Sequence, residues 1–200
     1  MTQFITSLLV MLNPIALFLY LLPVMKELEH GTFVKVFLRA TIISTVILAC
    51  FMASGDFLFK TLFQINIESF RLFGGIIIFT FAFLFIVSGQ KAFITIKGGI
   101  DTLPSEIALP FMVGAGNISL SIFAAQRIGV VPGITGLVIA MSVNFSIVMT
   151  LKFVRDSIKN YDMRVAFDRV MDIVLRLNGF FVGAIGVEMI RTALERLFMT

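Results

Sequence analysis

Six long apolar stretches constrain this chain more than any other feature of its sequence. A helix needs about 20 apolar residues to cross the ~30 Å hydrocarbon layer of a bilayer. Six stretches come close to that length, at residues 4–25, 37–58, 70–88, 107–125, 132–154 and 173–190. Strands are a poor alternative, because the stretches are too long, lack strict alternation, and an open sheet edge cannot face lipid. We therefore predict an all-α, polytopic membrane bundle of about six transmembrane helices, forming one transmembrane domain over residues 1–200.

The composition supports a membrane protein and argues against nucleic acid as a partner. The chain is 58% hydrophobic and 14% charged, with a mean hydropathy of +1.03, whereas soluble domains are about 45–50% apolar and roughly 25% charged. The pI of 9.5 comes from basic residues in short loops rather than along one polar face, as nucleic-acid binding would need. The first stretch lacks a positive leader and a small-residue cleavage site, so we interpret it as a retained helix.

The distribution of Lys and Arg predicts the orientation. Eleven basic residues lie in or beside the first, third and fifth loops, including Lys91 and Lys97 in the third, and five lie at the termini and in the other loops. The positive-inside rule places the richer loops in the cytoplasm. Both termini are then predicted to face outward from a prokaryotic cytoplasmic (inner) membrane.

Two similar segments suggest an internal repeat. Arg71-Leu72-Phe73-Gly74 and Arg176-Leu177-Asn178-Gly179 occupy matching places in the third and sixth stretches. Division near residue 97 gives two halves, about 1–97 and 98–200, of three helices each. An odd number of helices per half forces the halves into opposite orientations, which is a transporter architecture. The two halves are expected to move against each other around a central site.

The first and fourth stretches contain residues that interrupt helices. The first contains Asn13-Pro14-Ile15-Ala16, where proline removes a backbone donor and clashes with the preceding turn. About ten apolar residues precede it, or roughly 15 Å of helix, so this break is predicted near the midplane. The fourth contains Gly114-Ala115-Gly116, where Asn117 or Ser119 is expected to cap a second half-helix.

Paired interruptions predict a substrate site formed by residues 13–16 and by Gly114, Ala115, Gly116, Asn117 and Ser119. Backbone groups freed at membrane depth must face protein or a water-filled cavity. A half-helix N-terminus suits a carboxylate, and exposed carbonyls suit an ammonium group or a cation. The alternative interpretation is structural: a proline kink together with a glycine-rich packing face.

These segments resemble the MarC family of small membrane proteins, also classed as neutral amino acid transporters, over nearly the whole chain. Residues 13–16 correspond to the family's Asp/Asn-Pro-x-Gly element, and residues 64–75 to its pattern before and within the third helix. Residues 110–116 correspond to Pro-x-x-x-Gly-Pro-Gly. Residues 176–179 and Glu188-Met189 correspond to Arg-x-x-Gly and Gln-Met in the last helix.

The resemblance implies a six-helix protein of the inner membrane. Some family members are thought to carry glycine, alanine and similar amino acids, while others have a multiple-antibiotic-resistance name without an established activity. This chain departs from the family pattern at four positions: Ala16, Gln64, Ala115 and Glu188. These departures leave the substrate open.

Other polar residues in the apolar stretches have two interpretations each. Glu188 is a candidate for proton or cation coupling, or lies near the outer interface paired with Arg191 or Arg127. Asn144 and Asn178 line the cavity, or serve as polar contacts between helices. Arg71 and Arg176 are interface anchors, or gating residues.

The function predicted from the sequence is a secondary transporter. It would carry a small neutral amino acid, or a similar solute, coupled to a proton or sodium gradient. An enzyme is not expected, since one His and one Cys do not form a zinc set and no nucleotide-binding or nucleophile motif occurs. No cofactor or metal is expected either. The alternatives are a non-transporting scaffold or complex subunit, and a passive channel or exporter; an oligomer fits any of them.

Overall fold

The computed structural model describes residues 1–88 and 101–198, and this described part folds into helices. They are α1 (Thr2–Leu12), α2 (Pro14–Glu27), α3 (His30–Phe57), η1 (Leu58–Leu62), α4 (Ile67–Ser88), α5 (Leu103–Ile107), η3 (Ala108–Met112), α6 (Ala115–Ile128), α7 (Val130–Ser157) and α8 (Tyr161–Phe198). Here η1 and η3 are single π-helical turns. The expected repeat boundary near residue 97, and Lys91 and Lys97 in the third loop, lie outside the described residues.

Five helical segments in the described part are long and apolar enough to cross a membrane, at Thr2–Glu27, His30–Gly55, Ile67–Ser88, Val130–Ser157 and Tyr161–Phe198. The remaining predicted stretch is divided among α5, η3 and α6. The all-α polytopic membrane fold is therefore confirmed, and so are the interruptions in the first and fourth stretches. The inverted six-helix repeat itself stays a prediction.

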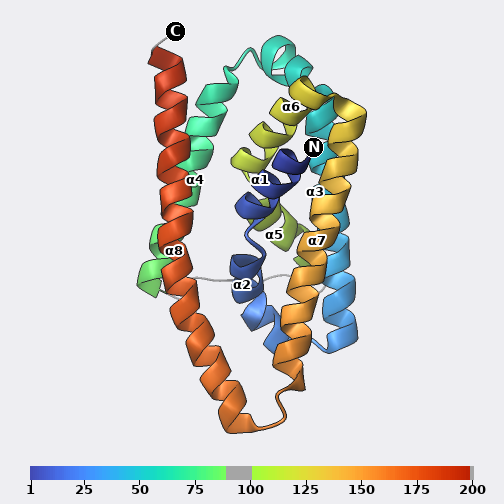
Figure 1. Ribbon diagram of the computed structural model, residues 1–200, viewed down its shortest axis with the longest axis vertical. Coiled ribbons are helices and arrows are strands. Elements are labelled where there is room, and N and C mark those ends of the chain that lie inside the picture. The colour runs from blue at the N-terminus through green and yellow to red at the C-terminus, as the bar shows by residue number, and fades with distance from the viewer. Residues whose placement is uncertain (89–100, 199–200) are drawn as a thin grey trace.

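The bundle has two distinct ends (Figure 1). The turns from α2 to α3 and from α7 to α8 lie at one end, which we call the loop end. At the opposite end are η1, the turn from α6 to α7, and the C-terminal part of α8. Met1 and Arg196 line the same hollow there, so we call it the terminal end.

The helices pack as two units. Helices α4 and α8 run antiparallel and contact each other along the length of α4, forming an arm beside the rest of the molecule (Figure 1). Helices α3, α6 and α7 pack on one another, and α1 packs on α6 and α7. We call α1, α2, α3, α5, η3, α6 and α7 the main bundle. Both sequence halves contribute to both units, so the packing does not divide the molecule at residue 97.

Glycines bring the two helices of the α4–α8 arm into backbone contact. A Cβ on Gly186 would lie 2.8 Å from the Phe79 nitrogen and 3.0 Å from the Gly75 oxygen. A Cβ on Gly179 would lie 3.2 Å from the Ala82 oxygen. Small residues permit this close approach, which drives helix association in a solvent as apolar as the side chains.

The most buried helix is α2, in the centre of the molecule (Figure 1). Every residue from Ala16 to Leu22 is buried. Large apolar side chains are exposed instead on the outer surfaces, including Phe73, Phe83, Phe180 and Phe181 of the α4–α8 arm. This distribution suits a protein surrounded by lipid, because lipid does not penalise exposed apolar groups.

The fifth loop is much shorter than predicted. Helix α7 continues to Ser157, and α8 begins at Tyr161 and runs for 38 residues. Residues 161–172 are therefore helical, with Asn160 accepting the backbone N–H of Asp162 at 2.9 Å. The apolar pattern begins only at residue 173, whereas the helix begins at Tyr161. At 1.5 Å per residue α8 is about 57 Å long, well above the ~30 Å hydrocarbon thickness.

Candidate functional site

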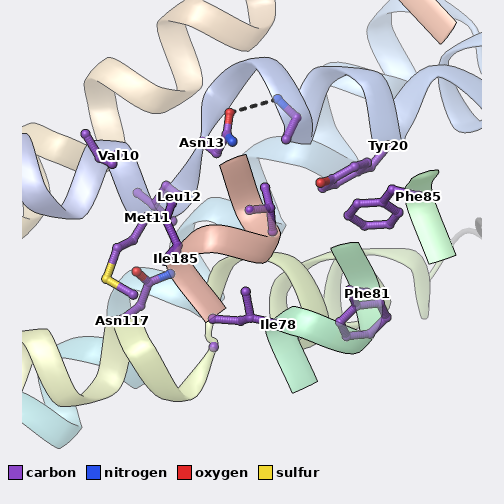
Figure 2. A pocket seen from close by; sticks show the side chains of 13 residues that line it. Val10, Met11, Leu12, Asn13, Tyr20, Ile78, Phe81, Phe85, Asn117 and Ile185 are labelled. Carbon is purple, nitrogen blue, oxygen red and sulfur yellow. Dashed lines mark hydrogen bonds between the residues drawn. The ribbon is translucent and has the colours of Figure 1, made fainter. Parts of the chain in front are cut away.

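The first interruption is a single residue, Asn13, between α1 and α2. Its backbone lies in the left-handed region at φ 47° and ψ 74°, which Asn tolerates better than most residues. Its side-chain oxygen accepts the backbone N–H of Ala16 at 3.2 Å and so caps α2 (Figure 2). Pro14 follows as the first residue of α2, where its missing N–H costs nothing.

Asn13 also joins the two units of the fold. Its Nδ2 donates to Oδ1 of Asn178, on α8, at 3.0 Å. The Asn178 side chain also interacts with Tyr20 of α2, and its Nδ2 is buried without a hydrogen-bond partner among the described residues. Asn178 does not line the cavity described below. Its bond to Asn13, which does line the cavity, matches the second interpretation of Asn178, a polar contact between helices.

The second interruption lies at Val113 and Gly114, between η3 and α6. Gly114 is the N-cap of α6 in an extended conformation, with no side-chain cap. The predicted capping by Asn117 or Ser119 is wrong, because both residues lie inside α6. Asn117 instead donates from Nδ2 to the carbonyl of Met112 at 2.9 Å and so closes the gap from the other side. Its Oδ1 is buried without a partner among the described residues.

A cavity of about 80 Å³ lies between the two interruptions. Asn13, Ala16, Gly114 and Asn117 line it, so the structure brings together four residues that the sequence predicted (Figure 2). Its remaining lining residues are Val10, Met11, Leu12, Tyr20, Ile78, Phe81, Phe85, Val182 and Ile185. Most are apolar residues inside apolar stretches, so no sequence signal distinguished them; a tyrosine in the first stretch was the one available hint.

The cavity lies where two opposite helix ends meet. The last carbonyl bonded within α1 is that of Leu9, which accepts the Asn13 N–H at 3.0 Å, so the carbonyls of Val10, Met11 and Leu12 lie beyond it. In α6 the first bond runs from the Ile118 N–H to the Gly114 carbonyl, which leaves the preceding N–H groups outside the helical ladder. A helix C-terminus is partially negative and an N-terminus partially positive. The cavity is therefore flanked by both partial charges.

The other residues predicted for the site lie outside this cavity. Pro14 is half-buried and Ile15 is exposed on the outside of α2, at 50%. Ala115 and Gly116 lie in the first turn of α6, against Gly74 and Met11 respectively. Ser119 and Asn144 are buried in α6 and α7, and their side-chain polar atoms have no partner among the described residues. They are candidates for buried water contacts rather than for direct solute contact.

Glu188 lies away from the cavity. Its side chain is exposed on α8 and forms an ion pair with Arg191, which matches the interfacial interpretation. Arg71 pairs with Glu68 at 3.1 Å. Arg176 pairs with Asp172 at 3.3 Å and donates to the Ile86 carbonyl at 2.9 Å, which ties α8 to α4. None of these residues touches the cavity.

Comparison with known proteins identifies the family. The model of MarC family integral membrane proteins matches residues 1–198. This chain belongs to the MarC family. A UPF0056 membrane protein of Pyrococcus horikoshii is 26% identical over 186 residues, covering 92% of this chain and 88% of that protein. The UPF0056 membrane protein YhcE of Escherichia coli is 25% identical over 206 residues, covering 98% and 92%. No solved structure matches significantly.

The family match confirms the resemblance seen in the sequence motifs. It makes this MarC-family chain an integral membrane protein, in agreement with its apolar helices. The names of the relatives give no solute, so the substrate has to be inferred from the cavity.

Proposed function

We propose that this MarC-family protein is a secondary transporter for a small neutral amino acid such as glycine or alanine, or a similar small solute. The observation that carries the proposal is the cavity between the carbonyl end of α1 and the N–H end of α6. A zwitterion has one negative and one positive group close together, and the two helix ends offer the complementary partial charges. The membrane it crosses is proposed to be a prokaryotic inner membrane, with both termini outside.

The two helix N-termini at the interruptions are not equivalent as carboxylate sites. At α2, Pro14 has no N–H and the Ala16 N–H is bonded to Asn13. At α6, the N-terminal N–H groups have no side-chain cap, and a Cβ on Gly114 would meet nothing within 4 Å. We therefore place the solute carboxylate at α6. The ammonium group of the solute then faces the carbonyls of α1 and Oδ1 of Asn117.

The size and polarity of the cavity favour a small neutral solute. About 80 Å³ holds roughly five to eight water-sized groups, since one water needs about 10–15 Å³. Glycine and alanine fall near the lower end of this range. Tyr20, Phe81 and Phe85 bound the cavity on one side (Figure 2), which limits longer side chains. The lining residues include no charged side chain, which disfavours a solute with net charge.

Coupling to a proton or sodium gradient is part of the proposal. None of the described residues that line the cavity is a carboxylate or a histidine, and Glu188 lies outside the cavity, paired with Arg191. Carbonyls at an interrupted helix can coordinate Na⁺, and those of Val10, Met11 and Leu12 provide such oxygens. We therefore favour Na⁺ as the coupling ion.

The test is solute flux in liposomes that contain the purified protein. We expect saturable uptake of glycine and alanine that a Na⁺ gradient accelerates and that a pH gradient alone affects less. Absence of flux for either amino acid under both gradients would contradict the proposal. Currents that rise without saturation would indicate a passive channel. A stoichiometric partner in mild detergent, together with no flux, would indicate a scaffold or complex subunit.

A matched pair of glycine variants tests the location of the site. Gly114→Leu adds a side chain beside the cavity without a clash, because a Cβ there meets nothing within 4 Å, and Gly31→Leu makes the same change at the start of α3, where a Cβ also meets nothing. We expect Gly114→Leu to abolish uptake and Gly31→Leu to retain it, with both proteins folded by gel filtration. Equal uptake in the two variants would place the site elsewhere.

A further inference from the structure

A second hollow of about 240 Å³ lies at the terminal end of the molecule. It is formed by α1, α4, α6 and α8, and the same four helices line most of the central cavity. On α1 the hollow reaches Ser7 and the cavity starts at Val10. On α6 the hollow reaches Leu120 and the cavity Asn117. The two spaces therefore follow one another along the same helices, about one helical turn apart on α1 and α6 and two to three turns apart on α4 and α8.

The hollow has an excess of positive charge. Arg71, Arg127 and Arg196 line it. The nearby Glu68 pairs with Arg71 and Arg196, each at 3.1 Å, and none of the described residues that line the hollow is acidic. The guanidinium groups of Arg71 and Arg196 also lie 4.9 Å and 5.9 Å from the ring centre of Phe123. Arg127 has no ion-pair partner within the described residues, so its charge faces the hollow uncompensated.

We infer that this hollow is a vestibule that attracts the carboxylate of the solute before it enters the central cavity. The inference rests on the proposed function, because it treats the hollow as the mouth of the transport path. Clefts lined by one sign of charge focus the electrostatic field and raise the local concentration of opposite charge. A zwitterion would approach with its carboxylate first, which is the orientation that the N-terminus of α6 requires.

Two methionines that meet beside the cavity, Met11 of α1 and Met189 of α8, would form the barrier between the vestibule and the cavity. The position of a Cβ on Gly116 would be 3.1 Å from both Sδ and Cε of Met189, and it would also overlap Cε of Met11. Met11 lines the cavity and its thioether extends toward α6 (Figure 2). The two side chains therefore meet over Gly116. Methionine has three rotatable bonds and repacks easily, so a small movement can open and close this barrier.

The methionine barrier crosses the boundary between the two units of the fold. Met11 and Gly116 belong to the main bundle, and Met189 belongs to the α4–α8 arm. Movement of the arm away from α1 and α6 would separate Met189 from Met11 and connect the vestibule to the cavity.

Thiol modification tests the vestibule without requiring transport. In a Cys50→Ala background, Ser7→Cys places a single thiol in the vestibule. We expect a negatively charged thiosulfonate reagent to modify it about tenfold faster than a positively charged one of similar size. Arg127→Gln should remove most of this preference, whereas Arg169→Gln, an exposed change at the loop end, should leave it intact. Equal modification rates for the two reagents in the Ser7→Cys protein, with Arg127 intact, would contradict the proposal that the hollow attracts negative charge.

The barrier is tested in the same background with Gly114→Cys, which places the thiol in the cavity. Impermeant reagent applied to the terminal end should modify it slowly, and Met11→Ala or Met189→Ala should accelerate modification about tenfold. The control is Met163→Ala, at an exposed position. If neither methionine variant changes the rate in folded protein, the barrier is wrong.

Flux measurements then separate the inference from the proposed function. Arg127→Gln should raise the KM for uptake from the terminal end several-fold and leave the maximal rate unchanged. If the thiol results hold but no amino acid is transported, the vestibule and the barrier stand and the amino acid substrate is wrong. If transport occurs with an unchanged KM in Arg127→Gln, the proposed function stands and the vestibule is wrong.

Discussion

At the scale of single residues, Asn13 makes more structural contacts at the first interruption than its neighbour Pro14. The sequence indicated a break here because Pro14 cannot continue a helix, and that prediction is confirmed. It gave no sign that the Asn13 side chain would cap α2 and bond to Asn178 on α8. A local motif reports the loss of a backbone donor, whereas the contact with a residue 165 positions away depends on how the helices pack.

Replacement of Asn13 should separate its two roles. Asn13→Asp keeps an oxygen for the Ala16 N–H but loses the donor to Asn178, whereas Asn13→Ala loses both bonds. We expect Asn13→Ala to destabilise the folded protein by about 1–2 kcal/mol through loss of the cap and to lower the midpoint of thermal unfolding in detergent. Asn160→Ala is the control for a cap at an exposed end. A midpoint for Asn13→Ala equal to that of the parent would contradict the capping role.

For Glu188 we predict that substitution has no effect on transport. Its side chain is exposed and paired with Arg191, and it lies outside the cavity. We therefore expect Glu188→Gln to leave the rate and the ion dependence of uptake unchanged. Uptake in Na⁺ and in pH gradients, compared with the parent protein in the same liposomes, provides the measurement. Loss of coupling in this variant would restore Glu188 as a coupling residue.

At the scale of helices, the sequence was a good guide to where helices are interrupted and a poor guide to which helices pack together. The apolar stretches and their interruptions are local properties, so they could be identified. The close pairing of α4 with α8 depends on glycines at the matching faces of two helices about 100 residues apart. The matching Arg-x-x-Gly segments suggested a repeat, but a repeat does not specify which copies touch. The long extension of α8 also escaped prediction, because residues 161–172 are too polar for a membrane span.

Two glycines on α8 should respond differently to the same substitution. A Cβ on Gly186 would press on backbone atoms of α4, at 2.8 Å and 3.0 Å, which cannot rotate away. A Cβ on Gly183 would lie 3.4 Å from the Ala82 Cβ, an ordinary contact. We expect Gly186→Ala to lower thermal stability by the equivalent of about 1–3 kcal/mol, and Gly183→Ala to change it little. Equal stability of the two variants would show that the helices do not approach this closely.

At the scale of the whole molecule, the packing divides the described part into the main bundle and the α4–α8 arm rather than into the two sequence halves. The central cavity lies between these units, with Asn13 and Asn117 on one side and Ile78 and Ile185 on the other. Separation of the units would therefore open the cavity directly. The sequence could not predict this arrangement, since the lining of the arm side is apolar throughout.

Crosslinks within and between the units test which parts must separate. In a Cys50→Ala background, Gly74→Cys with Ala115→Cys joins the arm to α6. A Cβ on Gly74 would overlap the Ala115 Cβ, so the two helices must shift apart by about 1–2 Å before this disulfide reaches its usual Cβ separation. Ala82→Cys with Gly183→Cys joins α4 to α8 inside the arm, with Cβ atoms 3.4 Å apart, which is near the usual disulfide range. We expect oxidation to stop uptake reversibly in the first pair only. Inhibition in both pairs, or in neither, would contradict movement of the arm as one body.

Because α8 is long, a small tilt of this helix at one point would move its distant end by several ångströms. From Gly186, in the contact with α4, to Asp168 at the loop end is about 27 Å along the helix. Asp168 is bound there by Lys26 of α2 at 2.9 Å and by Arg155 of α7 at 2.9 Å. A tilt of about 10° around Gly186 would move Asp168 by about 5 Å, which is more than these ion pairs can stretch. The ionic contacts at the loop end would therefore resist a rotation of α8 about its contact with α4, and a small turn at Gly186 would become a large displacement at the loop end.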